Sequence, residues 1–258
     1  MRDDTRYRDL PTTDWPVARS DDLLDALQAD YLPDLDHVDM RGLLVDPRLG
    51  RVALVSSFGA ESAVLLHYVT QVFPDIPVLF IDTGTHFPET LEYRDRLAAR
   101  LKLNLVNLRP DPSLIAGEDP AGDLARRDPN MCCTLRKTFP LADALEGFDT
   151  WISGRKRYQG QTRAALPALE RDGGHVKVNP LVFWSPDEIA AYFRKHELPR
   201  HPLVDKGYVS IGCAPCTRPV RAGEDLRAGR WADNPDKTEC GIHLGPDGRF
   251  VRGWARRD

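Results

Sequence analysis

The chain has 258 residues, of which 41% are hydrophobic and 29% are charged, a balance typical of globular proteins and unlike that of disordered chains. Its 35 Lys and Arg residues and 39 Asp and Glu residues give a net charge of −4, which argues against a general nucleic-acid coat protein. The apolar runs at 52–55 and 76–81 are much shorter than the roughly 20 residues that a membrane-spanning helix needs. Residues 1–20 are polar and lack the apolar core of a secretory signal, so we expect a flexible tail on a cytoplasmic protein.

Beyond this tail, short apolar runs alternate with helical patterns. Buried strands are predicted at 52–55, 77–81, 103–108 and 150–154, and helices are predicted to begin near Ser20, Ser62, Pro88 and Ser185. This alternation predicts an α/β domain over 21–205, with a Rossmann-like parallel sheet and helices on both faces. Residues 206–258 are richer in Gly, Arg and Pro and hold three of the five cysteines. They are interpreted as a cysteine-rich C-terminal segment.

The loop after the first predicted strand has the properties of an anion site. Ser57, Phe58 and Gly59 connect the strand to a helix whose first turn contains Ser62. Such a junction offers unpaired N–H groups and the positive end of the helix dipole. The loop matches neither the Walker pattern nor the dinucleotide fingerprint. An ordinary Ser-capped turn remains the alternative.

Four of the cysteines form two pairs, Cys132–Cys133 and Cys213–Cys216. Clustered cysteines in a reducing compartment indicate metal binding or catalysis more often than disulfides. Four thiolates suit either tetrahedral zinc or an iron–sulfur cluster. Adjacent side chains diverge in an extended chain, which favours the larger cluster over a single ion. Buried cysteines without a metal are the third interpretation.

Basic residues gather around these motifs although the chain is acidic overall. Guanidinium groups bind sulfate or phosphate oxygens bidentately, and a solvated surface cation is the alternative for each residue. For the run at 155–157, a solvated charge run and a binding role are equally open. The basic residues are Arg136, Lys137, Arg155, Lys156, Arg157, Arg163, Arg218, Arg221, Arg227 and Arg230.

The fifth cysteine, Cys240, stands alone near the C-terminus, three residues before His243. A thiolate is a strong nucleophile, and a neighbouring cation stabilises it. His243 could supply that cation or a proton. Cys240 is therefore either a catalytic nucleophile or an inert free thiol.

Together these motifs resemble the assimilatory sulfonucleotide reductases, and in particular their iron–sulfur branch, the thioredoxin-dependent adenylyl-sulfate reductases. The resemblance extends over nearly all of the chain from about Ser20. It depends on the motifs SSFGAES (56–62), DTGTHFPET (82–90), CCTLRK (132–137), GCAPC (212–216) and ECGIHLG (239–245). The loop departs from the usual pattern of this branch, which has Asp where this chain has Ser62.

The resemblance implies a PP-loop fold of the adenine nucleotide alpha hydrolase-like type. It implies that Ser57, Phe58, Gly59 and Ser62 receive the phosphosulfate, and that Asp82, Thr83 and Gly84 line the adenosine pocket. It further implies contacts from Arg163, Arg227 and Arg230 to the anionic groups, with His243 beside them. The two cysteine pairs, Cys132, Cys133, Cys213 and Cys216, would bind one 4Fe–4S cluster, and Lys137 would lie between the cluster and the substrate.

The implied reaction reduces adenylyl sulfate to sulfite and AMP through an S-sulfonate on Cys240, which thioredoxin or glutaredoxin resolves. It belongs to sulfate assimilation and cysteine biosynthesis. Two alternatives within enzymes are a phosphoadenylyl-sulfate reductase and an iron–sulfur tRNA-thiolating enzyme, although the SGGxDS-type ATP loop of the latter is absent. A metal-containing sensor that binds nucleic acid is the alternative outside enzymes. We expect neither a nucleic-acid partner nor a membrane partner, and a homo-oligomer remains open.

Overall fold

The computed structural model describes residues 21–35, 37–234, 237, 239–240 and 242. The strands are β1 (Val52–Val55), β2 (Pro77–Ile81), β3 (Asn104–Leu108), β4 (Thr150–Ile152), β5 (Leu169–Asp172) and β6 (His175–Val178). The α-helices are α1 (Asp21–Tyr31), α2 (Met40–Leu44), α3 (Ser62–Thr70), α4 (Pro88–Leu101), α5 (Pro112–Glu118), α6 (Leu124–Arg127), α7 (Pro129–Cys133), α8 (Phe139–Leu145) and α9 (Pro186–Lys195). None of the helices in these residues is both long and apolar enough to cross a membrane.

The strands form one sheet in the order β3-β2-β1-β4-β6-β5. All neighbouring strands pair in parallel except β5, which runs antiparallel to β6 at the edge. The chain starts at β1 in the middle, winds outward to β3, and then returns to β4 on the other side of β1. This reversal creates the crevice at the carboxyl ends of β1 and β4 where ligands bind in doubly wound folds.

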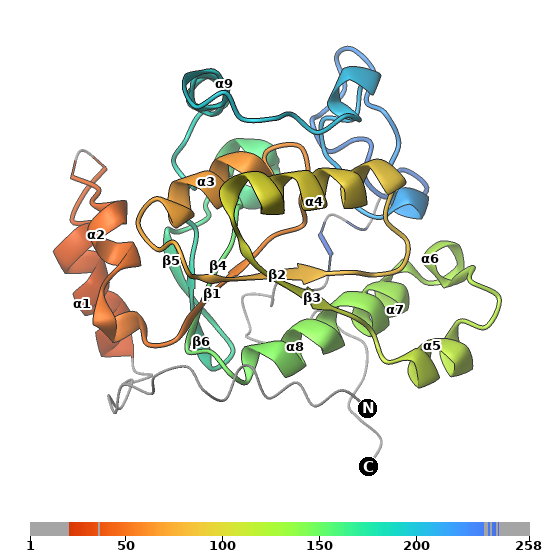
Figure 1. Cartoon of the computed structure of the whole chain (residues 1–258), viewed down its shortest axis with the longest axis horizontal. Helices are drawn as coiled ribbons and strands as arrows, with labels where there is room; N and C mark the ends of the chain where they lie inside the picture. The colour runs from red at the N-terminus through yellow and green to blue at the C-terminus, as the bar shows by residue number, and fades with distance from the viewer. Residues whose placement is uncertain (1–20, 36, 235–236, 238, 241, 243–258) are drawn as a thin grey trace.

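Each central strand is buried on both faces because helices cover both sides of the sheet. Val52 and Leu54 belong to the apolar core beneath α3 and α4, whereas Ala53 and Val55 belong to a second core against α8. The side chains alternate in this way because successive residues of a strand point to opposite faces. Figure 1 shows α3 and α4 on one side of the sheet and α8 on the other.

Local signals determine where the two best-predicted helices begin. Pro88 occupies the first turn of α4, and a capping box between Ser185 and Glu188 precedes α9. The predictions for β1, β2 and α4 are confirmed. The observed ends of β3 and β4 and the start of α9 lie within two residues of their predicted positions. The β5–β6 hairpin was not predicted from the sequence.

The environment of the first cysteine pair differs from the expectation. Cys132 and Cys133 lie at the end of α7, which continues into a π-helical turn at Thr134–Thr138 and then into α8. The assumption of an extended chain at this pair is therefore wrong. Asp128 explains the helix, because its carboxylate accepts the backbone N–H groups of Asn130 and Met131 at the N-cap.

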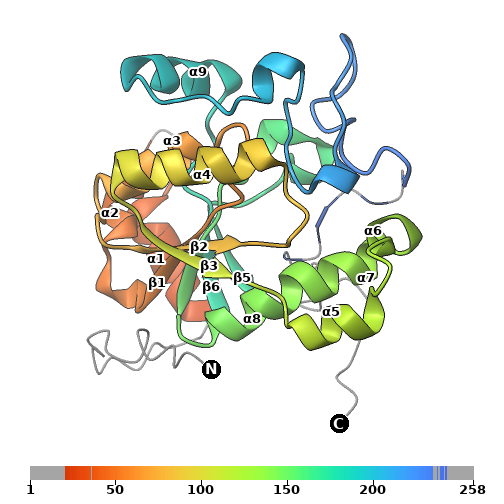
Figure 2. The ribbon, with the colours of Figure 1, turned by 45° about the vertical axis from the view of Figure 1, so that its right-hand side comes forward.

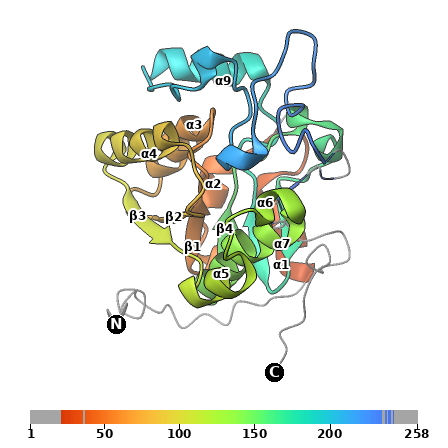
Figure 3. The same cartoon turned by 90° about the vertical axis from the view of Figure 1, so that its right-hand side faces the viewer.

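The chain after α9 has little regular structure and lies over the carboxyl end of the sheet. Figures 2 and 3 show this segment, in blue, beside α9 and extending down toward α6. It contains the 3-10 turn Ala214–Cys216 and an isolated bridge between Thr217 and Arg230. The segment thus closes the crevice that the sheet leaves open.

Candidate active site

A cavity of about 420 Å³ opens where β1 and β4 end. Its lining comes mainly from four stretches of chain: the loop at 55–62, the segment at 153–163, the loop at 209–212 and the C-terminal stretch at 226–242. Lys137 and His86 add side chains from two further elements. The topology therefore brings the predicted anion loop, part of the basic cluster and Cys240 to one place.

The predicted anion loop forms one wall of this cavity through Ser57, Gly59 and Ser62. Phe58 has a positive φ of 48°, and its ring is buried against Phe80 rather than lining the cavity. A Cβ on Gly59 would lie 3.3 Å from the carbonyl oxygen of Ile211, so the close approach of these two segments favours glycine. The N-cap residue of α3 forms no side-chain capping hydrogen bond, which leaves the start of this helix suited to an anion.

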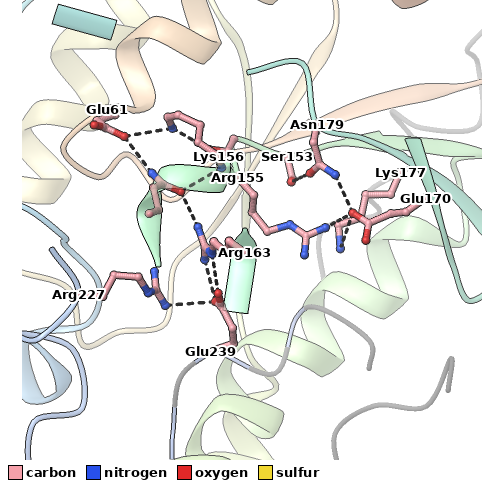
Figure 4. A network of polar contacts seen from close by, with 12 residues as sticks. Glu61, Ser153, Arg155, Lys156, Arg163, Glu170, Lys177, Asn179, Arg227 and Glu239 are labelled. Carbon is pink, nitrogen blue, oxygen red and sulfur yellow. Dashed lines mark hydrogen bonds and ion pairs between the residues drawn. The ribbon is translucent and has the colours of Figure 1, made fainter. Parts of the chain in front are cut away.

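Glu61 connects this loop to the segment after β4. Its carboxylate accepts hydrogen bonds from the Tyr158 hydroxyl at 2.6 Å and from Gln159 Nε2 at 2.9 Å, and it pairs with Lys156 Nζ at 3.1 Å. Lys156 is only 2% exposed, and burial lowers its pKa although Glu61 opposes the shift. The Glu61–Lys156 pair is thus part of the framework of the cavity (Figure 4).

Arg155 extends the polar network toward the sheet. Its guanidinium pairs with Glu170, and Lys177 pairs with Asp172 at 2.9 Å. Burial, followed by repulsion from Arg163, lowers the pKa of Arg155 to about 10. The interpretation of residues 155–157 as a solvated charge run is wrong for Arg155 and Lys156, because segments distant in sequence bury and pair both side chains.

Glu239 pairs with two of the three arginines predicted to bind substrate anions. Arg163 donates to both of its carboxylate oxygens, from Nε at 2.5 Å and from Nη2 at 2.7 Å, and Arg227 Nη2 donates at 3.2 Å. Burial raises the pKa of Glu239, but the hydrogen bond and charge of Arg163 and the charges of Arg227 and Arg155 outweigh it, so the net shift is downward. The next residue, Cys240, lines the cavity and is partly buried.

The third predicted arginine, Arg230, lies over the ring of Trp231, 4.4 Å from the centroid. Arg227 and Lys237 also face this ring, at 5.7 and 5.5 Å. Trp231 is 5% exposed and lines the cavity. The ring of Trp231 therefore makes cation–π contacts with three cations at the C-terminal side of the cavity.

The two cysteine pairs lie on facing segments. Cys132, Cys133 and Cys213 are buried and Cys216 is partly buried. Burial raises the pKa of Cys132 to about 12, and the charges of Cys133, Cys213 and Cys216 add to that rise. The four thiols are thus close enough to interact, yet no three His, Cys, Asp or Glu side chains in the described residues are arranged to hold a single metal ion.

Lys137 lies between these thiols and the cavity. It occupies the π-helical turn after Cys133 and lines the cavity. Burial opposes its charge, but Cys213, Cys133 and Cys240 outweigh that effect and raise the pKa of Lys137 above its ordinary value. The expectation that Lys137 lies between a cluster and the substrate stays a prediction.

The segment at 82–84 is oriented differently from the expectation. Asp82, Thr83 and Gly84 are not among the residues that line the cavity, whereas the flanking Ile81 and His86 are. The Thr83 hydroxyl lies 3.3 Å from Cys213 Sγ, and Asp82 Oδ1 accepts the backbone N–H of Gly84. The role of these three residues toward substrate stays a prediction. His243 lies outside the described residues.

Sequence reasoning missed Glu61, Trp231 and Glu239 as parts of the site. All three lie within the sequence motifs or directly beside a residue of the basic cluster. Their roles depend on partners far away in the sequence, such as the 97 positions between Glu61 and Tyr158. For Glu239, the sequence offered one signal, which is its place in the ECG motif directly before Cys240.

Comparisons with known proteins agree with this geometry. The model of the phosphoadenosine phosphosulfate reductase domain matches residues 51–219. An adenosine 5'-phosphosulfate reductase of Chelativorans sp. (strain BNC1) is 52% identical over 76% of this chain and 80% of its own length. Adenosine 5'-phosphosulfate reductase 1 of Bacillus subtilis (strain 168) is 46% identical over 72% of this chain and 82% of its own length.

Solved structures support the fold. A phosphoadenylyl-sulfate reductase from Candida auris superposes with a TM-score of 0.62 at 24% identity, covering 76% of this chain and 96% of that one. A Candida glabrata FMN adenylyltransferase superposes with a TM-score of 0.52 at 15% identity, covering 79% and 75%. The family model and the close relatives lead to one conclusion: this chain belongs to the phosphoadenosine phosphosulfate reductase family.

Proposed function

We propose that the chain reduces adenylyl sulfate to sulfite and AMP, in assimilatory sulfate reduction and cysteine biosynthesis. The observation that supports this most directly is the position of Cys240, which lines the same cavity as the loop at 57–62 and the cations Lys137 and Arg230. The names of the close relatives point to the same substrate.

The proposed chemistry has two steps. The Cys240 thiolate attacks the sulfur of the sulfate group, the bond from that sulfur to the phosphate oxygen breaks, and AMP leaves with the electron pair. Cys240 then carries an S-sulfonate. A dithiol reductant of the thioredoxin or glutaredoxin type attacks Cys240 Sγ and releases sulfite, and its second thiol reduces the resulting mixed disulfide.

The side chains of the cavity offset the repulsion in the first step, because an anion attacks an anionic substrate. Lys137 and Arg230 make no ion pair with a carboxylate in the described part of the chain, so their charges remain available to a bound anion. The start of α3 adds backbone N–H donors. Each well-placed donor contributes roughly 3 kcal/mol to the stabilisation of a transition state.

The four paired cysteines would hold one 4Fe–4S cluster. Their donor set fits this group, because four thiols from two short segments lie near one another and cysteine thiolates are the usual ligands of such a cluster. When bound, the cluster would supply local charge and rigidity beside Lys137 rather than electrons for turnover. Lys137 would stand between that charge and the substrate.

Mass spectrometry of the purified protein tests the first step. After incubation with adenylyl sulfate and no reductant, we expect a sulfonate adduct that peptide mapping assigns to Cys240. The Cys240→Ser variant should carry no adduct. A wild-type enzyme that releases sulfite on addition of a dithiol, yet never carries the adduct, would contradict the proposal.

The same enzyme separates the two candidate nucleotides. We expect kcat/KM to be higher with adenylyl sulfate than with phosphoadenylyl sulfate, as the relatives' names suggest. The reverse preference would make phosphoadenylyl sulfate the proposed substrate, and it would not change the proposed chemistry at Cys240.

A further inference from the structure

Arg230 lacks the polar partners that hold the other two arginines predicted to bind substrate anions. Arg163 and Arg227 both pair with Glu239. Arg230 makes no ion pair with a carboxylate in the described part of the chain, and its buried Nε has no hydrogen-bond partner among the described residues. Because a free arginine side chain populates many rotamers, contacts of another kind must hold this guanidinium if it is to keep one orientation.

Two residues enclose the guanidinium of Arg230, and the first is Trp231. Its indole is 5% exposed, and Arg230 Cζ lies 4.4 Å from the ring centroid. At this distance the negative face of an aromatic ring attracts a cation, and the attraction strengthens where water is excluded. The ring therefore supplies a contact that holds Arg230 without neutralising its charge.

The second residue is Gly212, which leaves room for the guanidinium. A Cβ at this position would lie 2.5 Å from Arg230 Cζ, a distance that real Cβ atoms do not show. Gly212 is not among the glycines with a positive φ, so its backbone conformation is open to other residues. Glycine is therefore required here for space and not for chain conformation.

Backbone hydrogen bonds fix the spacing between Gly212 and Trp231. The N–H of Trp231 donates to the carbonyl oxygen of Cys216 at 3.0 Å, and Thr217 forms an antiparallel bridge with Arg230. The N–H of Gly212 donates to Thr217 Oγ1 at 3.2 Å. Gly212, Arg230 and Trp231 all line the cavity. A slot for one guanidinium is thus built into the wall of the cavity.

We propose that Gly212 and Trp231 are positioning residues, which hold the Arg230 guanidinium in this slot so that its N–H groups face the anionic part of the bound substrate. A guanidinium with a fixed plane can bind two oxygens of a sulfate or phosphate group at once. The role toward substrate rests on the proposed function, but the slot itself does not.

Phenylglyoxal, which forms adducts with accessible arginine side chains, tests the slot without any nucleotide. Gly212→Ala places a methyl group where the guanidinium lies and should displace it toward the open cavity. We expect adduct formation at Arg230, followed by peptide mass spectrometry, to become about fivefold faster, since the displaced cation loses its contact with the indole. Trp231→Leu removes the indole and should have the same effect. Gly117→Ala is the matched control, because a Cβ at that position meets no atom within 4 Å, and it should leave the rate unchanged.

A double-mutant cycle tests the role toward substrate. We expect Gly212→Ala to lower kcat/KM for adenylyl sulfate about tenfold, because a misplaced group loses much of its effect on the transition state. In an Arg230→Ala background there is no guanidinium to displace, so the same substitution should change kcat/KM less than about twofold. Damage to the neighbouring Cys213 would lower kcat/KM by the same factor in both backgrounds. Trp231→Leu should show the same dependence on Arg230.

Two results would overturn the inference. One is an adduct rate at Arg230 that is the same in Gly212→Ala and Trp231→Leu as in the wild-type protein. The other is an equal loss of kcat/KM with and without Arg230, which would mean that Gly212 and Trp231 act through the fold instead of through the guanidinium. Faster adduct formation in a protein that makes no sulfite would refute the proposed function alone, because phenylglyoxal needs no substrate.

Discussion

The two sides of the cavity are held together by different forces. The strand-end wall, residues 56–62 and 153–163, follows directly from β1 and β4 and is anchored by two apolar cores and by the pair of the buried Lys156 with the partly buried Glu61. The C-terminal wall, residues 209–212 and the described residues between Leu226 and Ile242, has hardly any regular structure and is held by ion pairs and by cations stacked on Trp231. Apolar packing fixes a surface permanently, whereas a few ion pairs can break and re-form. The two walls therefore differ in what holds them, because apolar packing dominates at the strand ends, whereas ion pairs and cation–π contacts dominate around Cys240.

The largest expected effect follows from replacing the proposed nucleophile, which lies in the C-terminal wall. Cys240→Ser should lower sulfite formation by a factor of about 1,000 or more, because a serine hydroxyl stays protonated where a thiol ionises readily. The free energy of unfolding should change little, since Cys240 is only partly buried. Sulfite release in the presence of a dithiol measures the loss, and sulfite production at the wild-type rate would remove Cys240 from the mechanism.

Lys137 lies where the cysteine pairs meet the cavity. Two substitutions of this residue separate the contribution of its charge to kcat/KM from the contribution of its shape. Lys137→Ala should lower kcat/KM by roughly 100- to 1,000-fold, because it removes one donor to the developing charge. Lys137→Arg keeps the cation and should cost about tenfold. Equal losses in the two variants, measured by steady-state kinetics, would show that the charge of Lys137 is not what matters.

Glu61→Gln tests the claim that the strand-end wall is part of the folding core. It leaves the buried Lys156 without its carboxylate, and we expect the free energy of unfolding to fall by about 3 kcal/mol. Urea denaturation gives this value. The surface pair of Arg218 and Glu224 provides the control, because Glu224→Gln should leave the free energy of unfolding nearly unchanged. Equal changes in the free energy of unfolding of the two variants would show that the Glu61–Lys156 pair stabilises the fold no more than a surface pair does.

An effect that appears only as the pH rises concerns Lys177, which lies beside the strand-end wall against the ring of Trp151. Burial and then the charge of Arg155 lower the pKa of Lys177 from 10.5 to about 8, although Asp172 opposes them. Between pH 8 and pH 10.5 the unfolded chain therefore binds more protons at this position than the folded chain does. The free energy of unfolding should rise with pH across this window, by up to about 3 kcal/mol relative to a Lys177→Met variant.

Denaturation at several pH values measures that difference. Lys206→Met is the control, because the Lys206 side chain is 60% exposed and pairs at the surface with Glu89. The gap between wild type and Lys206→Met should stay nearly constant from pH 8 to pH 10.5. A constant gap for Lys177→Met as well would mean that Lys177 titrates as an ordinary lysine.

The same contrast explains how much of the molecule the sequence could predict. β1 and β2 are predictable because both faces of each strand are buried, which makes every residue of these strands apolar. α9 is predictable because Ser185 and Glu188 form its capping box locally. The β5–β6 hairpin could not be predicted because several of its residues, such as Glu170 and Lys177, are charged, and their partners become apparent only in the folded chain.

Some parts of the candidate site could likewise be predicted from the sequence, and others could not. The loop at 57–62 and the cysteines could be located, because their chemistry is visible in the residue types. The buried state of Lys156 could not, because its partner Glu61 lies 95 positions earlier in the chain and no local pattern links the two. The pairing of Glu239 with Arg163 likewise depends on how the tail crosses the cavity.

Trp231 gives this protein a natural optical reporter. Its indole lies beneath Arg227, Arg230 and Lys237, and its backbone has a positive φ of 49°, which an L-residue rarely adopts without tertiary support. Any rearrangement of the neighbouring guanidinium groups would alter the surroundings of this ring and so its emission. In a background where the other four of the five tryptophans are replaced, fluorescence could follow the C-terminal wall during a single catalytic cycle.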